Sequence, residues 1–340
     1  MWLKILTAFA MPLVVALAVG ALLVQTHHTE IPALNLPPLP SSAPSPPPGK
    51  GPGPTLTAFE NACSGKIPMP FTGIAVNNAI AQHATAFHQM TGARIRVVEF
   101  YNPFPGPFQA AEALQATKLG ALPLIQLNPR KATMTDVAAG RYDADIKNYA
   151  RAVKAFTCHV VLSFGHEMNG WWYHWGLPWT QPSVFIAAWR HIHDIFAAEG
   201  ATNVIWSWDP SHQYAEFKAG KTASLASEWY PGDRYVDWVG LDGYLNPGQN
   251  FKEVFAHQLA SIASVAGSKP VYLAETGVAA NVPAGHNPYE IRQMDDLFAG
   301  ISRNHIKGLI WFDQNAKQKW ELQGRKAAVA EYRKLVASFP

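Results

Sequence analysis

The chain has 340 residues, of which only 15% are charged, and its formal net charge is +3 at pH 7. This small positive excess, without a lysine or arginine run in the predicted domain, argues against nucleic-acid binding. The chain contains two cysteines, Cys63 and Cys158, whose number and spacing exclude a cysteine-based metal site but leave open one disulfide or two buried thiols.

The amino end carries an uncharged, apolar run over residues 5–25, directly after Lys4. This pattern indicates either a secretory signal peptide or an uncleaved membrane anchor. Because the run is long and no small-x-small cleavage motif follows it, we predict over residues 1–26 an anchor in the cytoplasmic membrane. The rest of the chain is then extracytoplasmic, and a cleaved signal with a secreted protein is the alternative.

Residues 27–56 are rich in proline, serine and glycine, as in LPPLPSSAPSPPPGKGPGP. Such a segment cannot bury apolar surface and tends towards polyproline II, so we interpret it as an extended linker. The remaining residues, 57–340, are enough for one large domain, which we expect to be monomeric.

Within this domain, short apolar β-prone runs alternate with longer helical stretches. Most runs are too continuously apolar for a sheet with one face in water, which favours parallel strands covered by helices. Eight such units predict an α/β fold, a closed (β/α)8 TIM barrel. An open doubly wound sheet is the alternative, but no glycine-rich phosphate-binding motif follows the first run. The eight runs are FTGIAVN (71–77), RIRVVEFY (94–101), ALPLIQLN (121–128), HVVLSFGHE (159–167), NVIWSWDP (203–210), VDWVGLDGY (236–244), PVYLAETG (270–277) and IKGLIWFDQ (306–314). The predicted helices are 79–91, 108–119, 143–157, 182–199, 222–229, 251–266 and 288–304.

Six of the runs carry an acidic residue at or near their carboxyl end. A carboxylate in an apolar strand destabilises the fold unless it is paired or takes part in chemistry. The carboxyl ends of all strands of a barrel meet at one mouth, so we expect these side chains to line one pocket. The acidic residues are Glu99, Glu167, Asp209, Asp242, Glu275 and Asp313, of which Asp209 and Asp242 are expected to support the site structurally.

Glu167 and Glu275 stand in the most specific surroundings, SFGHEMNGWWYHWG and VYLAETG. Glycoside hydrolysis requires one carboxylic acid that protonates the leaving oxygen and one carboxylate that attacks or stabilises the anomeric carbon. Glutamates that end the fourth and seventh strands would face each other, and a separation of about 5–5.5 Å would predict retention of configuration. For either acid alone, a salt-bridged or capping carboxylate is the structural alternative.

The sequence lacks the motifs of two other kinds of hydrolase, the zinc-dependent and the serine-dependent enzymes. HEMNG is similar to the zinc motif HExxH, but its fifth residue is Gly170, and the GxSxG motif of serine hydrolases is absent. We predict neither a metal nor an organic cofactor, because the two carboxylates carry the chemistry.

The segment HEMNGWWYHWG resembles the strand-four signature of glycoside hydrolase family 26, which contains many β-mannanases of the retaining (β/α)8 clan. The likeness extends from about residue 68 to 330. It implies that Glu167 is the acid/base and Glu275 the nucleophile. It also implies that His166 positions the sugar and the nucleophile, and that Trp172 is the family's aromatic five residues after the acid.

Three further positions follow from the same resemblance. Tyr244 matches a tyrosine that hydrogen-bonds the nucleophile, and Trp311 matches the aromatic platform beneath the sugar. Asn128 stands where many family mannanases have a histidine, and Phe312 where an arginine is common. Both positions contact sugar in the family, so these departures bear on which β-glycan is bound.

The other tryptophans near the predicted mouth are ambiguous. Trp171 and Trp175 can each pack in the fold or stack on sugar. Trp206 and Trp208 share one face of a strand, because side chains alternate with period two. We place Trp208 at the site and Trp206 inside the barrel.

These observations predict a retaining endo-β-glycanase acting outside the cytoplasm, with β-1,4-mannan as its expected polysaccharide substrate. A β-1,3-1,4-glucanase or a xylanase on the same scaffold is one alternative. A catalytically inactive barrel that binds polysaccharide is the other, although a pure binding protein needs neither Glu167 nor Glu275.

Overall fold

The computed structural model describes residues 55–213, 224–282, 285–314 and 319–339. The predicted signal or anchor over residues 1–26 lies outside the described residues, as does the predicted linker except for its last two positions, where α1 begins at Thr55. No helix within the described ranges is both long and apolar enough to cross a membrane.

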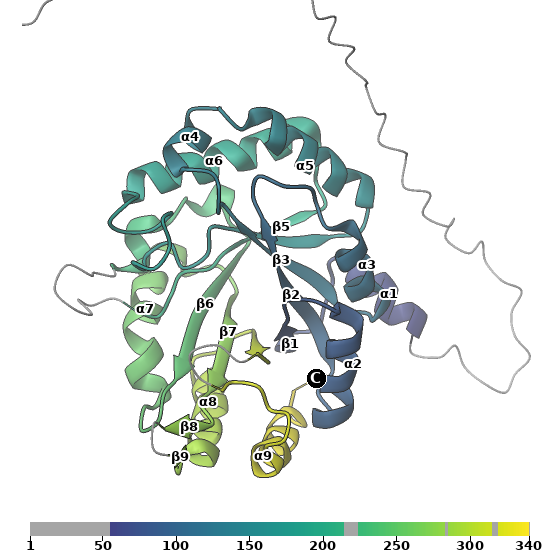
Figure 1. Ribbon diagram of the computed structural model, residues 1–340, viewed down its shortest axis with the longest axis vertical. Helices are drawn as coiled ribbons and strands as arrows, with labels where there is room; N and C mark the ends of the chain where they lie inside the picture. Colours follow the sequence, from purple (N-terminus) through teal and green to yellow (C-terminus); the bar gives the residue numbers. More distant parts are fainter. Residues whose placement is uncertain (1–54, 214–223, 283–284, 315–318, 340) are drawn as a thin grey trace, which may run out of the picture. The chain divides into compact units, whose positions relative to one another are not determined.

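Eight parallel strands close into a barrel in the order β1-β10-β7-β6-β5-β4-β3-β2, with helices around it (Figure 1). Each predicted β-prone run overlaps one of these strands, so the predicted (β/α)8 fold is confirmed. The barrel strands are β1 (Phe71–Ala75), β2 (Ile95–Pro103), β3 (Leu122–Asn128), β4 (Val160–Phe164), β5 (Val204–Trp208), β6 (Trp238–Leu245), β7 (Val271–Val278) and β10 (Gly308–Phe312).

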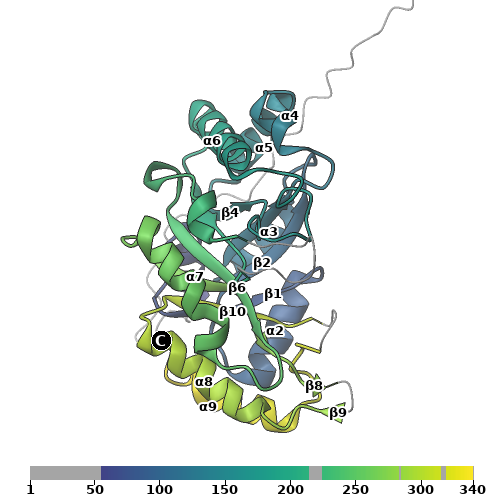
Figure 2. The same ribbon diagram turned by 90° about the vertical axis from the view of Figure 1, so that its left-hand side faces the viewer.

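The six long predicted helices are present as α2, α3, α5, α6, α7 and α8. Of the shorter predicted helix 222–229, the described part contains a 3₁₀ turn at Ala226–Trp229. Helices α8 and α9 lie side by side in both views (Figures 1 and 2). The α-helices are α1 (Thr55–Cys63), α2 (Ile80–Thr91), α3 (Ala110–Lys118), α4 (Met134–Ala138), α5 (Asp143–Phe156), α6 (Pro182–Glu199), α7 (Phe251–Ala266), α8 (Glu290–Arg303) and α9 (Lys326–Val336). A second 3₁₀ turn spans Asp233–Tyr235, and β8 (Asn281–Val282) pairs with β9 (Gly285–His286).

The strands are apolar on both faces, because one face fills the barrel and the other packs on the helices. The interior cluster includes Phe71, Val97 and Leu124. The larger cluster, between strands and helices, includes Val98 and Phe100 of β2. Adjacent positions on β2 thus belong to different clusters, as the period of two requires.

On β5 this alternation contradicts two predictions. Trp206 packs against Trp189 of α6, with ring centroids 6.0 Å apart, so it does not lie inside the barrel. Trp208 packs against Tyr230 at 5.1 Å and is absent from the cavity described below. The positions that point inward are Ser207 and Asp209, whose side chains hydrogen-bond each other.

The two cysteines form a disulfide between Cys63, the last residue of α1, and Cys158, just before β4. The backbone N–H of His159 also donates to the carbonyl of Cys63 at 2.9 Å. The bridge joins positions 95 residues apart, so it ties α1 to the wall of the barrel and resolves the alternative that the sequence left open.

Candidate active site

A cavity of about 620 Å³ opens at the carboxyl ends of the barrel strands. Both Glu167 and Glu275 line it, so the structure brings the two predicted carboxylates to one pocket. The other lining residues are aromatic or carry amides, with one arginine and one histidine. They are Asn77, Tyr101, Asn128, Arg130, Trp171, Trp172, Tyr173, His212, Gln213, Tyr244, Asn246, Gln249, Phe312, Gln314 and Trp320.

A β-bulge on β7 directs Glu275 into the cavity. Opposite β6, Gly240 pairs with Tyr272 but Asp242 pairs with Glu275, so β7 advances three residues while β6 advances two. Tyr272 and Ala274 belong to the barrel interior, and on a regular strand the next residue would point outward. The extra residue in the bulge turns the side chain of Glu275 inward, as bulges near active sites do, and places its carboxylate at the mouth of the barrel.

Two tyrosine hydroxyls hold the carboxylate of Glu275. Tyr101 donates to Oε1 at 2.7 Å, and Tyr244 donates to Oε2. Burial, and next the charge of Glu275, raise the pKa of each tyrosine well above its usual value, so both remain donors. The contact expected for Tyr244 is present, whereas Tyr101 was not singled out in the sequence.

Glu167 lies just after β4, at a backbone φ of +54° that non-glycine residues seldom adopt. Its backbone N–H donates to the carbonyl of Asp209 at 2.7 Å, and the indole of Trp172 donates to its Oε2 at 2.5 Å. A Cβ at Gly170 would lie 2.3 Å from the Trp172 ring. Glycine at that position therefore lets the indole reach the acid.

His166 lies beneath the cavity, 2% exposed, with its Nδ1 2.9 Å from Asn128 Oδ1. Burial is the main cause that lowers the pKa of His166 to about 4, so its imidazole is neutral at ordinary pH and Nδ1 donates to the amide oxygen. Asn128 also lines the cavity, as predicted, although its amide oxygen contacts His166.

Among the described residues, one group of three could supply metal ligands: His166, Asp242 and Glu275 each offer an atom within 4.8 Å of the others. Both oxygens of Glu275 already accept tyrosine hydroxyls. The surroundings therefore suit a hydrogen-bonded carboxylate better than a metal ligand.

The acids at the strand ends do not all line the pocket, in contrast to our expectation. Asp209, fully buried, accepts hydrogen bonds from Gln126 Nε2 and the backbone N–H of Gly240, both at 3.1 Å. Neither oxygen of buried Asp242 accepts a hydrogen bond from a described residue. Burial, and next the charge of Glu275, raise the pKa of Asp242 well above its usual value. Asp313 instead accepts the backbone N–H of Leu322 at 2.8 Å.

Two tryptophans considered as sugar-binding residues are structural: Trp175, for which the sequence left packing and stacking open, and Trp311, the predicted platform. Trp175, 1% exposed, stacks on Tyr173 at 4.2 Å and donates to the carbonyl of His166 at 2.7 Å. Trp311 is fully buried, packs against Tyr332 of α9 at 5.1 Å and is absent from the cavity wall. The prediction of Trp311 as the platform is wrong, because its side chain faces the helices.

Trp320 supplies an aromatic wall instead. Its ring centroid lies 4.7 Å from that of Tyr244, and Phe312 contacts the same tyrosine at 5.6 Å. The indole of Trp311 supports this wall from below by donating to the carbonyl of Trp320 at 3.0 Å. Trp320 lies in the segment after β10, where no motif marked it.

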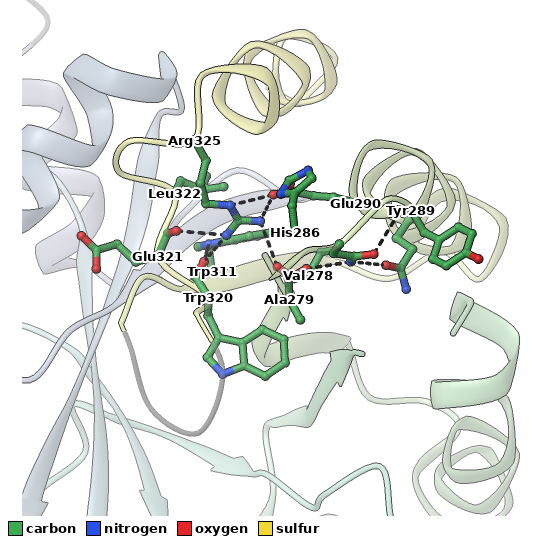
Figure 3. Close-up of polar contacts among 12 residues, drawn as sticks. Val278, Ala279, His286, Tyr289, Glu290, Trp311, Trp320, Glu321, Leu322 and Arg325 are labelled. Atoms are coloured by element: carbon green, nitrogen blue, oxygen red, sulfur yellow. Dashed lines mark hydrogen bonds and ion pairs between the residues drawn. The ribbon is translucent and has the colours of Figure 1, made fainter. Parts of the chain in front are cut away.

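Arg325 ties the Trp320 segment to β7 and α8 (Figure 3). Its Nη1 donates to the carbonyl of Trp320 at 3.1 Å, and its Nη2 donates to that of Val278, the last residue of β7, at 3.1 Å. Its Nε donates to Glu290 at 2.6 Å, and both side chains of this ion pair are largely buried, 12% and 4% exposed.

Arg325→Met is expected to destabilise the protein by about 3–5 kcal/mol, because it leaves the Glu290 carboxylate buried without its cation. Denaturant unfolding measures this change. Arg303→Met is the matched control: it breaks an ion pair with Asp296 whose side chains are 62% and 34% exposed, and it should cost under about 1 kcal/mol. Equal effects of both variants would contradict the role given to Arg325.

Comparison with known proteins adds independent findings. The model of glycosyl hydrolase family 26 matches residues 130–306. Endoglucanase H of Acetivibrio thermocellus is 32% identical over 234 residues, which cover 64% of this chain and 25% of that protein. A mannan endo-1,4-beta-mannosidase of Bacillus subtilis is 30% identical over 128 residues, 34% of this chain and 30% of that protein. The chain thus matches only about a quarter to a third of the length of these relatives.

Solved structures share the fold. A Cellulomonas fimi endo-beta-1,4-mannanase superposes with a TM-score of 0.62 at 17% identity, covering 84% of this chain and 74% of that one. A family 26 beta-mannanase of Bacteroides ovatus gives 0.59 at 18% identity, covering 84% and 93%. Because the family model spans more than half of the sequence, from just after the third barrel strand to just before the eighth, this chain belongs to glycosyl hydrolase family 26.

Proposed function

We propose that the protein is a retaining endo-β-glycanase that hydrolyses β-1,4-mannan, with Glu275 as nucleophile and Glu167 as acid/base. The observation that carries the proposal is that one cavity holds both carboxylates in different surroundings. Two hydroxyls donate to Glu275, which favours its ionised form. Glu167 instead lies beside Trp172, whose indole N–H donates to its Oε2, and Trp171 lines the cavity next to them.

In the first step, Glu275 attacks the anomeric carbon while Glu167 gives its proton to the glycosidic oxygen. The bond between that oxygen and the anomeric carbon breaks, and a glycosyl ester forms on Glu275. Glu167, now a carboxylate, then takes a proton from water, whose oxygen attacks the anomeric carbon and releases Glu275. Two displacements at the same carbon retain its configuration.

The rest of the cavity suits a neutral sugar chain. Aromatic faces at Trp171, Phe312 and Trp320 can stack on the apolar faces of pyranose rings, and amides such as Asn246 and Gln249 can bond hydroxyls. Several named relatives are mannan endo-1,4-beta-mannosidases, which supports mannan as the first substrate to test.

A β-glucan is the second candidate, because the match to Endoglucanase H covers 64% of this chain whereas that to the Bacillus subtilis mannosidase covers 34%. Phe312 in the cavity wall and Asn128 beside His166 also depart from the pattern of many family mannanases.

The test is hydrolysis of defined mannan, mixed-linkage β-glucan and xylan oligosaccharides, read by product mass, with the first-formed anomer followed by NMR. We expect internal cleavage of mannan with a retained β-anomer. Cleavage of mixed-linkage glucan alone would select the second candidate. An inverted product would overturn the double displacement, and binding without cleavage of any glycan would favour a binding barrel.

A further inference from the structure

Glu99 is a buried acid of β2 that interacts with the proposed nucleophile. It lies on β2 between Val97, which belongs to the barrel interior, and Tyr101, which lines the cavity. Positions 97, 99 and 101 alternate along β2 and therefore share its inward face, while Val98 and Phe100 pack on the helices. The Glu99 side chain is completely buried, so no solvent stabilises a charge on it.

The surroundings of Glu99 provide no compensating positive charge. Neither of its oxygens accepts a hydrogen bond from a hydroxyl or a cation in the described part of the chain. Its charged neighbours are the acids Glu275 and Asp209, and both their charge and hydrogen bonding with Glu275 raise the pKa of Glu99. The amide of Gln126 lowers this pKa, but its effect is smaller than that of burial and of either acid, and its Nε2 donates to Asp209 at 3.1 Å. An ionised Glu99 would therefore be both desolvated and repelled.

Two carboxyl groups in contact can form a hydrogen bond only if one of them carries a proton. Glu275 is the better site for the negative charge, because Tyr101 and Tyr244 both donate to it. Burial first, and then the charges of Glu275 and Asp209, raise the pKa of Glu99 well above its usual value. The shared proton therefore stays on Glu99.

We propose that Glu99 is a protonated carboxylic acid that donates a hydrogen bond to the carboxylate of Glu275 and thereby positions the nucleophile. Glu275 then receives three donors: two phenols at the cavity level and one carboxylic acid from below. The catalytic consequence rests on the proposed function; the protonation state of Glu99 does not.

A third donor has two effects on Glu275. It orients the carboxylate and, as a donor to the charged form, favours that form. It also stabilises the carboxylate that departs when water breaks the glycosyl ester, so it assists the second displacement. Glu99 itself gains and loses no proton during the reaction.

The kinetic test compares Glu99→Gln with Glu99→Met. The glutamine is neutral and keeps an N–H donor, so we expect kcat to stay within about threefold of the parent value. We also expect no shift of the acid limb, the low-pH side of the pH profile of kcat/KM. The methionine removes the donor, so kcat should fall by about tenfold or more and the acid limb should move up by about one pH unit.

Val97→Ala is the matched control, because it opens a cavity one layer below on the same inward face and removes no donor. It should lower the melting temperature without moving the acid limb. If Glu99→Met gives the same profile as Val97→Ala, Glu99 is merely structural. If Glu99→Gln moves the acid limb to lower pH, Glu99 carries a charge, and the proposal is overturned.

A second measurement does not depend on turnover. The infrared difference spectrum between the parent and Glu99→Gln at neutral pH, recorded without substrate, should contain the C=O band of one protonated carboxylic acid. A difference that shows only carboxylate bands would overturn the proposal. If no glycan is hydrolysed, the proposed function fails, while this band still decides the protonation state of Glu99.

Discussion

Glu275→Gln is expected to abolish hydrolysis of every β-glycan, lowering kcat/KM by about 10⁴-fold or more while the protein remains folded. An amide has the shape of the carboxylate but cannot form the glycosyl ester. Tyr101 can still donate to the remaining carbonyl oxygen, and the Tyr244 hydroxyl can turn to accept from the new N–H, so the cavity wall should keep its geometry. Reducing-end release from the polysaccharide and oligosaccharide binding by calorimetry measure the two consequences.

Glu228→Gln is the matched control, because Glu228 is an exposed acid on the Ala226–Trp229 turn and does not line the cavity. It should leave turnover unchanged. Undiminished hydrolysis by Glu275→Gln would exclude this residue as the nucleophile. If parent and variant bind oligosaccharide equally and neither cleaves it, the chain is a binding barrel.

The barrel could be predicted because its strands are buried on both faces and separated by long amphipathic helices. The same property explains the errors at Trp206, Trp208 and Trp311. Where both faces of a strand are apolar, a tryptophan fits either one, and the hydrophobic pattern does not say which residues face the axis. All three indoles pack towards the helices, and Trp311 is replaced at the cavity by Trp320.

The proposed catalytic pair was accessible to sequence reasoning because Glu167 sits in a dense local motif and both glutamates lie near the carboxyl ends of predicted strands. The way in which Glu275 reaches the cavity was not, because a bulge on β7 is set by its pairing with both neighbours. Tyr101 carried a usable signal, since it follows Glu99 by two residues on one strand face. Trp320 carried none, because its place depends on Arg325, which contacts residues far apart in the chain.

The acid/base assignment gives the second large expected effect. Glu167→Gln should lower kcat on polysaccharide by about 10²–10⁴-fold, because the amide cannot protonate a sugar leaving group. Aryl glycosides with acidic phenol leaving groups need no such proton, so their first displacement should be nearly unaffected and glycosyl-enzyme should accumulate as an initial burst. Rapid-mixing measurement of phenol release, beside steady-state hydrolysis of mannan or glucan, separates the two steps.

Two variants sharpen this assignment. Trp172→Phe removes the indole N–H that donates to Glu167 Oε2 but keeps the carboxyl group, so its loss of activity should be much smaller than that of Glu167→Gln. In Glu167→Ala, azide can enter the vacated space and attack the glycosyl-enzyme without general-base help, which should restore turnover of aryl glycosides and yield a β-glycosyl azide. Because azide would attack the face opposite Glu275, an α-glycosyl azide, or a uniform rate loss across all leaving groups, would contradict the acid/base role of Glu167.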